Sequence, residues 1–380
     1  MNIAIVLPCF KRVKTIRELC DTLLQADYLG DNVDIVFSID YSGSDEVVKF
    51  ANSFQWPNGK KRVITHQKNI GLRNNILFCG DLTSNYDAVI ILEDDLEVAP
   101  SFYRYAKQAA EFYEEDERIG GISIYAYHLE EITVTEFHPY YEGYDGYFVQ
   151  WASSWGQLWT RKQWNGFRNW YSEGKDIASV CMPSQVKKWK RSWKKFYIAY
   201  LVETNKYFLF PFFSHVYNGN KTGGVHTAES VTEVVTSSPL DFSCRDFHFA
   251  KFENLRHKYD AFFQHQPVEI VIGGQSVLCE FDLFGHKEKP IMPYVVTSRE
   301  CPNTIVIESF DAGMLPMEQN ILTKKDGRIF HLICSKDYHR TKPVPVSSFL
   351  PIRKRTVSAK QSIPVGFYQL IKRVKQKLKK

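Results

Sequence analysis

Apolar residues in the first hundred positions change their spacing several times along the chain. Short continuous apolar runs, rich in β-branched residues, are typical of strands buried on both faces of a sheet. Such runs occupy 3–7, 33–39, 62–65 and 89–92. Between them, apolar residues recur at helical spacing in 13–26, after Ser44, and in 72–82. This succession predicts an α/β fold with a doubly wound, mostly parallel sheet.

Polar residues follow three of these predicted strands directly. Pro8 to Arg12 follow the first strand, Asp40 follows the second, and Glu93 to Asp95 follow the fourth. In open sheets of this kind, ligands bind outside the carboxyl ends of the strands. We therefore expect the three clusters to meet at one edge of the sheet.

The last cluster places three adjacent carboxylates, Glu93, Asp94 and Asp95, after an apolar strand. Ionised carboxylates are costly to bury and repel one another. A divalent cation would relieve that repulsion, and Mn²⁺ and Mg²⁺ prefer carboxylate oxygen. The alternative is a solvated turn or the first turn of a helix near Pro100, where acids favour the helix dipole. The residue types favour the cation.

The pattern is less regular beyond residue 120. A strand is predicted at 120–124, and 171–200 is predicted to be helical and basic. An α+β extension follows, with strands at 268–272, 276–281, 304–308 and 329–334. The predicted organisation is a main α/β domain at 1–235, the extension at 236–340, a Pro- and Ser-containing linker at 341–363, and a terminal helix at 364–380.

Charge separates the end of the chain from the rest. Of the 48 Lys and Arg residues, 12 lie in 338–380, which holds no Asp or Glu; the rest has 36 basic against 43 acidic residues. Residues 364–380 place apolar residues at helical spacing among lysines. This is the pattern of a basic amphipathic helix on an anionic membrane surface. A solubilising tail or a helix docked on a partner are the alternatives. Nucleic acid is not expected, because the body is acidic.

The eight cysteines are scattered and form no CxxC pair, which is typical of reduced thiols in a cytoplasmic protein. No apolar stretch approaches the roughly 18–20 residues of a membrane span. The first apolar run is closed by Pro8 and is too short for a signal peptide. The expected location is cytoplasmic, peripheral at the inner membrane face.

Two stretches resemble a known family. The segment NIGLRNNILFCGDLTSNYDAVIILEDDLEVAPSFYRYA, with LPCFKR and SIDYSG before it, is similar to the GT-A glycosyltransferases. The resemblance is greatest to the N-acetylglucosaminyltransferase I-like branch and its bacterial surface-polysaccharide relatives. SSWGQLWTRKQW and LFPFFSHVYNGNKTGGVHT resemble the later half of the bacterial members. EDDLEVAP corresponds to the family's metal-binding DxD motif.

The resemblance implies roles for the acids and the residues near them. Asp95 would bind the metal, Asp94 would face the donor ribose or sugar, and Glu93 would support both. Asp40 would hydrogen-bond the uridine, although capping of the following turn is an alternative. Pro8 and Arg12 would contact the base and diphosphate. Arg73 would reach the donor from the next helix, and a surface helix position is the alternative.

Later residues would complete the site. His226, in a glycine-rich loop, would reach the metal or diphosphate; a solvated or structural histidine is the alternative. Trp155 and Gly156 would form the acceptor side, because aromatic faces stack on sugar rings. About half of Trp151, Trp155, Trp159 and Trp164 are expected to be buried core residues instead.

The catalytic base is the weakest part of the resemblance. Relatives carry an Asp near a Trp, whereas here Arg191 and Lys194 flank Trp193. An inverting enzyme needs a carboxylate to accept the proton of the acceptor hydroxyl. Asp145 is the first candidate, and the alternatives are Asp176 and Glu203.

The acidic cluster and the resemblance together imply a metal-dependent glycosyltransferase. The resemblance further implies that it is inverting and moves a sugar from a nucleotide sugar, expected to be a UDP-sugar, to a bacterial glycan or lipid-linked glycan. One alternative is a sugar nucleotidyltransferase, which normally has a glycine-rich loop after the first strand; LPCFKR has no glycine. The other is a catalytically impaired glycan-binding protein on a transferase fold, favoured by the missing acid near Trp193.

Overall fold

The computed structural model describes residues 1–131, 136–218, 240–299, 301 and 303–339. The chain divides into two compact units, Met1–Gln266 and Pro267–Lys380. The first unit extends past residue 235, the expected boundary, because β11 (Lys258–Tyr259) joins its sheet. The expected linker at 341–363 and the expected helix at 364–380 lie outside the described residues.

One half of the first unit's sheet is parallel throughout. It comprises β3, β2, β1 and β4 in that spatial order. Their bounds are Lys61–Thr65, Asp34–Ile39, Ile3–Cys9 and Ala88–Ile91. Three of these strands are buried almost throughout, because their apolar runs face helices on both sides, and β3 is the partly exposed edge. The predicted parallel strands are confirmed.

The other half of the sheet is mixed. Beyond β4 the order is β8, β6, β9, β7 and β11. Strand β8 runs antiparallel to both of its neighbours, and β7 runs antiparallel to β9 but parallel to β11. The bounds are Gln157–Thr160, Ile119–Ser123, Tyr207–Pro211, Gly146–Val149 and Lys258–Tyr259. Five of the eight pairings are parallel, so the predicted mostly parallel α/β sheet is confirmed.

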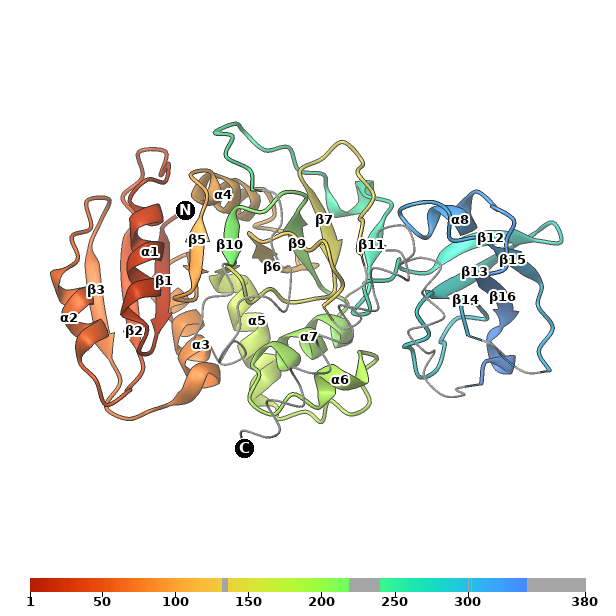
Figure 1. Ribbon diagram of the computed structural model, residues 1–380, viewed down its shortest axis with the longest axis horizontal. Helices are drawn as coiled ribbons and strands as arrows, with labels where there is room; N and C mark the ends of the chain where they lie inside the picture. Colours follow the sequence, from red (N-terminus) through yellow and green to blue (C-terminus); the bar gives the residue numbers. More distant parts are fainter. Residues whose placement is uncertain (132–135, 219–239, 300, 302, 340–380) are drawn as a thin grey trace, which may run out of the picture. The chain divides into compact units, whose positions relative to one another are not determined.

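Helices cover both faces of this sheet (Figure 1). On one face, α1 contacts α2, and the loop after α1 contacts the start of α4 through Asp27, whose N–H donates to the Pro100 carbonyl. On the opposite face, α3, α5 and α7 pack together. The bounds are Val13–Leu23 for α1, Glu46–Ser53 for α2, Phe102–Phe112 for α4, Gly71–Asp81 for α3, Arg161–Ser172 for α5 and Lys194–Glu203 for α7.

Close packing on the second face depends on one glycine. A Cβ atom at Gly80 of α3 would lie 2.2 Å from the indole ring of Trp164 in α5. Trp164 is buried and its Nε1–H donates to Asp81 at 2.8 Å, so the ring is held in place. Trp151, Trp159 and Trp164 are all core residues, as expected for part of the tryptophan set.

The segment predicted as one helix at 171–200 is interrupted. Helix α5 ends at Ser172, a four-residue helix α6 spans Ser184–Lys187, and α7 begins only at Lys194. Gly174, with φ of +64°, and Pro183 lie between α5 and α6. Both residue types disfavour a continuing helix, so the prediction of a continuous helix was wrong.

Smaller elements complete the first unit. Strands β5 (Leu96–Val98) and β10 (Val216–Asn218) form a separate antiparallel pair that lies beside α1. Short 3₁₀ turns span Leu82–Ser84 and Phe252–Asn254. No helix among the described residues is both long and apolar enough to cross a membrane. All eight cysteines are unpaired.

The second unit is built on a five-stranded mixed sheet. Its order is β12, β13, β14, β16 and β15, with bounds Val268–Ile272, Gln275–Asp282, Tyr294–Thr297, Phe330–Cys334 and Glu308–Phe310. A short helix α8 (Gln319–Leu322) and a 3₁₀ turn (Ser335–Asp337) accompany it. The strand expected at 304–308 begins only at Glu308, where it pairs with Leu332; Ile305 is 80% exposed and lies before the sheet.

Candidate functional site

The predicted polar clusters after β1 and β4 meet at one edge of the sheet. Val6 of β1 lies opposite Ile91 of β4 in parallel register, so the chain leaves both strands on the same side. Arg12 then reaches across to the acids. Its Nη1 donates to Asp95 at 3.0 Å, and its Nη2 donates to Asp94. Residues more than 80 positions apart are thus joined in one ion pair.

The ion pair is shielded from solvent. The side chains of Arg12, Asp94 and Asp95 are 16%, 7% and 17% exposed. Burial raises the pKa of Asp94 to about 6, although the charge of Arg12 opposes the shift. Burial, and then the charges of Asp95 and Asp94, hold the pKa of Glu93 well above its usual range. One guanidinium therefore does not balance three carboxyl groups.

A divalent cation fits this excess of acid. The Oδ1 atom of Asp95 is buried and has no hydrogen-bond partner among the described residues. An unsatisfied carboxylate oxygen is costly to bury, and carboxylate oxygens are preferred ligands of Mg²⁺ and Mn²⁺. Within the described part of the chain, no three His, Cys, Asp or Glu side chains are already arranged around a common point. His226 lies outside the described residues.

Asp40 ends β2 and is committed to backbone groups. Its carboxylate accepts the N–H groups of Tyr41 at 2.9 Å, Ile70 at 2.8 Å and Gly71 at 2.9 Å. It therefore holds the first turn of α3, where unpaired N–H groups need acceptors. Gly71 has a φ of +78°, which a residue without Cβ adopts readily. The uridine contact of Asp40 stays a prediction.

The other predicted donor residues lie near this edge. Pro8 is buried in β1 opposite Ser38. Arg73, on α3, donates to the carbonyl of Lys190 in the loop before α7, and its guanidinium stacks 5.1 Å from the centre of the Phe196 ring. Neither of these two contacts involves the acids. It joins α3 to the α7 segment.

Trp155 and Gly156 precede β8, which lies beside β4. The half-buried Trp155 ring packs edge-on against Tyr125 at 4.8 Å and tilted against Tyr127 at 6.0 Å. Gly156 has a φ of +85°, and a Cβ there would lie 2.6 Å from Ile124. The backbone can therefore turn tightly and leave Trp155 beside the acidic edge, where its acceptor role remains a prediction.

Asp145, the expected base, is held in an ion pair. It accepts both guanidinium nitrogens of Arg245, at 2.7 and 2.6 Å, and the N–H of His248 at 2.7 Å. Burial raises its pKa, but the bonds from Arg245 bring it below the usual value. It precedes β7, four strands from β4, which corresponds to about 19 Å at the usual strand spacing.

The two alternatives to Asp145 are also engaged. Glu203 accepts the indole N–H of Trp170 at 2.6 Å and lies 3.3 Å from the Lys175 ammonium. Asp176 accepts the N–H of Ala178 at 3.0 Å. Both therefore make local structural bonds, and neither bonds a residue of the acidic cluster.

Sequence reasoning missed a buried polar group on the α7 side. Lys194, the first residue of α7, is only 4% exposed, and its ammonium contacts Glu131 and the hydroxyl of Tyr127. Burial lowers the pKa of Lys194, although the charges of Glu131 and Glu93 oppose the shift. No spacing rule could have connected Glu131 to Lys194, because they lie 63 residues apart.

A second missed residue is Gln157, the first residue of β8. It lies opposite Ile91 of β4 and Ser123 of β6, and it is fully buried. Neither its amide oxygen nor its amide nitrogen has a hydrogen-bond partner within the described residues. A buried amide without partners is rare in a finished core, so this position is suited to a polar ligand atom. Its signal in the sequence is one Gln among apolar strand residues.

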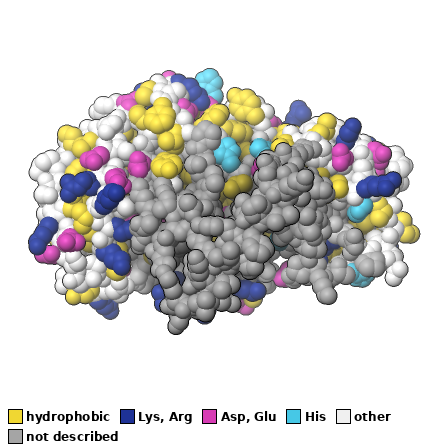
Figure 2. Space-filling model, in the orientation of Figure 1, with side chains coloured by type: hydrophobic (Ala, Val, Ile, Leu, Met, Phe, Trp, Pro, Cys, Tyr) yellow, Lys and Arg dark blue, Asp and Glu magenta, His cyan; other side chains and the backbone are white. Residues whose placement is uncertain are grey.

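The described surface carries both signs of charge. On the face drawn in Figure 2, Lys and Arg side chains are mixed with Asp and Glu over the described surface. The acids of the site differ from these exposed groups because they are shielded by Arg12 and by burial.

Comparison with known families agrees with this geometry. Residues 4–165 match the model of the family described as Glycosyl transferase family 2. The match covers less than half of the chain, and the matched stretch contains the parallel half of the α/β sheet. No curated protein matches the sequence.

Several solved structures are similar in part. Residues 1–349 of TarS from S. aureus share 15% identity, with 56% of this chain and 60% of that chain covered and a TM-score of 0.35. GalNAc-T7 with UDP, GalNAc and Mn²⁺ shares 14%, covering 56% and 42%, with a TM-score of 0.40. A mannosyltransferase from Pyrobaculum calidifontis with GDP-Man and Mn²⁺ shares 12%, covering 44% and 46%, with a TM-score of 0.31. The chain spans less than two thirds of each.

Proposed function

We propose that this protein is a glycosyltransferase that uses a nucleotide sugar, a UDP-sugar in the first place, and a divalent cation to glycosylate a bacterial surface glycan with inversion. The main support is that Arg12 pairs with Asp94 and Asp95 at the carboxyl edge of β1 and β4. One Asp95 oxygen is buried there without a hydrogen-bond partner among the described residues. Parallel sheets bind ligands at that edge.

Asp95, supported by Asp94, would hold Mn²⁺ or Mg²⁺. When bound, that cation neutralises the charge that develops on the leaving diphosphate. Arg12 supports the same role from the protein side, because its guanidinium already lies against both carboxylates and is matched in shape to phosphate oxygens. Glu93, the third acid, would support both residues, and a bound cation would favour its ionised form against the burial that raises its pKa.

The donor and acceptor sides follow from the same edge. Asp40 follows β2, Pro8 lies near the end of the neighbouring strand β1, and both would hold the uridine. Arg73, on α3, would contact the donor from the next helix. Trp155 offers a half-buried aromatic face for a sugar on the β8 side. A lipid-linked acceptor would be reached from the membrane surface through residues 364–380.

The proposal is tested by calorimetric binding of UDP, GDP and their common sugar conjugates, with and without Mn²⁺. We expect UDP and UDP-sugars to bind more tightly with Mn²⁺ than without it. In Asp95→Asn, added Mn²⁺ should no longer strengthen their binding. Asp21→Asn, an exposed acid on α1, is the matched control and should bind as the wild type does. Absence of nucleotide binding in every condition would refute the donor assignment.

One observation favours a second candidate, a glycan-binding protein with impaired catalysis. Asp145, the acid expected as base, is fully engaged by Arg245 and His248. That candidate predicts glycan binding with no release of UDP from any UDP-sugar. Turnover of even one donor by the wild type would exclude it.

A further inference from the structure

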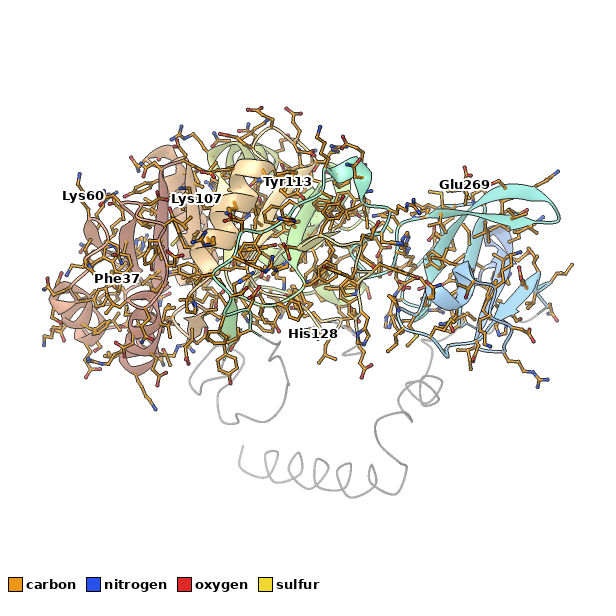
Figure 3. All side chains as sticks on the ribbon, turned by 90° about the horizontal axis from the view of Figure 1, so that it is seen from above. Phe37, Lys60, Lys107, Tyr113, His128 and Glu269 are labelled. Atoms are coloured by element: carbon orange, nitrogen blue, oxygen red, sulfur yellow. The ribbon has the colours of Figure 1, made fainter. Side chains whose placement is uncertain are left out.

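A buried polar cluster lies next to the acidic edge, and the proposed donor site does not use it. It consists of Lys194, Glu131, Tyr127 and Trp151. Tyr127 and Glu131 lie between β6 and β7, Trp151 follows β7, and Lys194 begins α7. Figure 3 labels His128, which belongs to the same β6–β7 segment as Tyr127 and Glu131.

Glu131 is held through one of its two carboxylate oxygens. Its Oε2 accepts the ammonium of Lys194, the hydroxyl of Tyr127 at 2.9 Å and the indole N–H of Trp151 at 3.0 Å. Oε1 takes part in none of these three bonds. The side chain is 27% exposed, whereas Lys194 is 5% exposed. One oxygen is therefore fixed, and the other can meet a ligand.

Lys194 connects this carboxylate to the acidic edge. Its charge acts on Glu93, where it lowers the pKa against the larger effect of burial. Tyr127, which bonds both Glu131 and Lys194, also packs against the Trp155 ring at 6.0 Å. The cluster thus borders both the donor acids and the aromatic side expected to hold the acceptor.

The chemical state of Glu131 suits proton transfer. Burial alone would raise its pKa, but the charge and hydrogen bond of Lys194 bring the pKa below its usual value. Glu131 is consequently an anion at neutral pH. A base that activates a hydroxyl must be ionised and must be held in place by groups that are themselves fixed.

The other described carboxylates named for this role are engaged elsewhere. Asp94 and Asp95 are bonded to Arg12, and Asp145 is bonded to Arg245. Glu131 combines an oxygen anchored by hydrogen bonds, a partly exposed side chain and proximity to both halves of the site.

We infer that Glu131 is the general base of the transfer reaction and that Lys194 is the residue that positions it; this inference rests on the proposed glycosyltransferase function. Oε1 accepts the proton of the acceptor hydroxyl. The acceptor oxygen forms a bond to the anomeric carbon, and the bond from that carbon to the diphosphate oxygen breaks. The electron pair leaves with the nucleoside diphosphate, and the proton passes from Glu131 to solvent.

The test uses the full chain and measures release of UDP from UDP-N-acetylglucosamine, UDP-glucose and UDP-galactose, with water as acceptor, alongside calorimetric donor binding. Glu131→Gln keeps the shape but cannot accept a proton. We expect its donor Kd to stay within about threefold while kcat falls by about 10²–10⁴-fold. Glu136→Gln, an exposed acid five positions later, is the matched control and should retain wild-type kcat.

Two further variants separate catalysis from folding. Glu131→Asp keeps the charge opposite Lys194 but withdraws the carboxylate, so it should fold and still lose kcat at an unchanged donor Kd. Lys194→Met should lower kcat more than donor affinity, and Lys194→Arg should recover part of the loss. If Glu131 and Lys194 had only a structural role, every variant would lose thermal stability, and kcat would not fall more than donor affinity.

The outcomes separate the two proposals. Wild-type kcat in Glu131→Gln, or in Glu131→Asp if the Gln variant does not fold, overturns the base assignment and leaves the transferase function standing. Failure of the wild type to bind or turn over any of the three donors overturns both. Intact donor binding with a selective loss of kcat supports both.

Discussion

Replacement of Arg12 by methionine examines how the acidic edge is held together. Arg12 is the cation that contacts both Asp94 and Asp95, and methionine keeps much of its apolar length without the charge. The substitution leaves three adjacent carboxyl groups without their guanidinium partner. We expect the folded protein to lose stability, and to lose more of it at high pH.

The magnitude follows from burial. The three side chains are 16%, 7% and 17% exposed, so solvent screening is limited. Removing one partner of a buried ion pair costs about 3–5 kcal/mol. In a unit of this size each kcal/mol shifts Tm by about 2–4 °C, so a cost of about 3 kcal/mol lowers Tm by about 6–12 °C.

The pH dependence has a definite sign. Burial raises the pKa of Asp94 from 3.8 to about 6, so the folded state binds this proton more tightly than the unfolded chain. Such a group stabilises the folded state below the unfolded pKa, and that contribution is lost as pH rises through the folded pKa. Arg12 opposes the shift, and its removal raises the pKa of Asp94 further. The stability loss should therefore be larger at pH 8 than at pH 5.

The assay is thermal unfolding at both pH values, with and without Mn²⁺. Mn²⁺ should raise the Tm of Arg12→Met more than that of the wild type, because the cation would take over neutralisation of the acids. Arg17→Met, an exposed arginine on the same helix α1, is the control and should shift Tm little. An equal loss at pH 5 and pH 8, or an equal loss in the control, would refute the reasoning.

Three further outcomes are expected. Gly80→Ala should cost about 1–3 kcal/mol, because its Cβ would lie 2.2 Å from the Trp164 ring; an unchanged Tm would contradict the packing of α3 on α5. Asp40→Ala should weaken UDP binding more than it lowers kcat, because it removes the carboxylate that accepts the N–H groups at the start of α3. A pure kcat defect at saturating donor would count against this. Removal of residues 364–380 should abolish binding to anionic vesicles while donor turnover persists; retained vesicle binding would disprove the role of that segment.

Local sequence determined the parallel half of the sheet. Strands β1, β2 and β4 were predictable because continuous apolar runs can be stable only when both faces are covered. The helix expected across 171–200 failed because Gly174 and Pro183 interrupt it, a backbone effect that residue composition alone understates. The strand expected at 304–308 failed because sheet formation depends on a partner, and pairing with β16 starts only at Glu308.

The same division holds for the site. The acids and Arg12 were predictable because each follows a strand, and parallel strands bring their carboxyl ends to one edge. The pairing of Glu131 with Lys194 was not predictable, because it joins an irregular segment to a helix start 63 residues away. Only the tertiary structure decided it. A buried ammonium needs an anionic partner, and the packed chain, not the local sequence, determines which carboxylate is within reach.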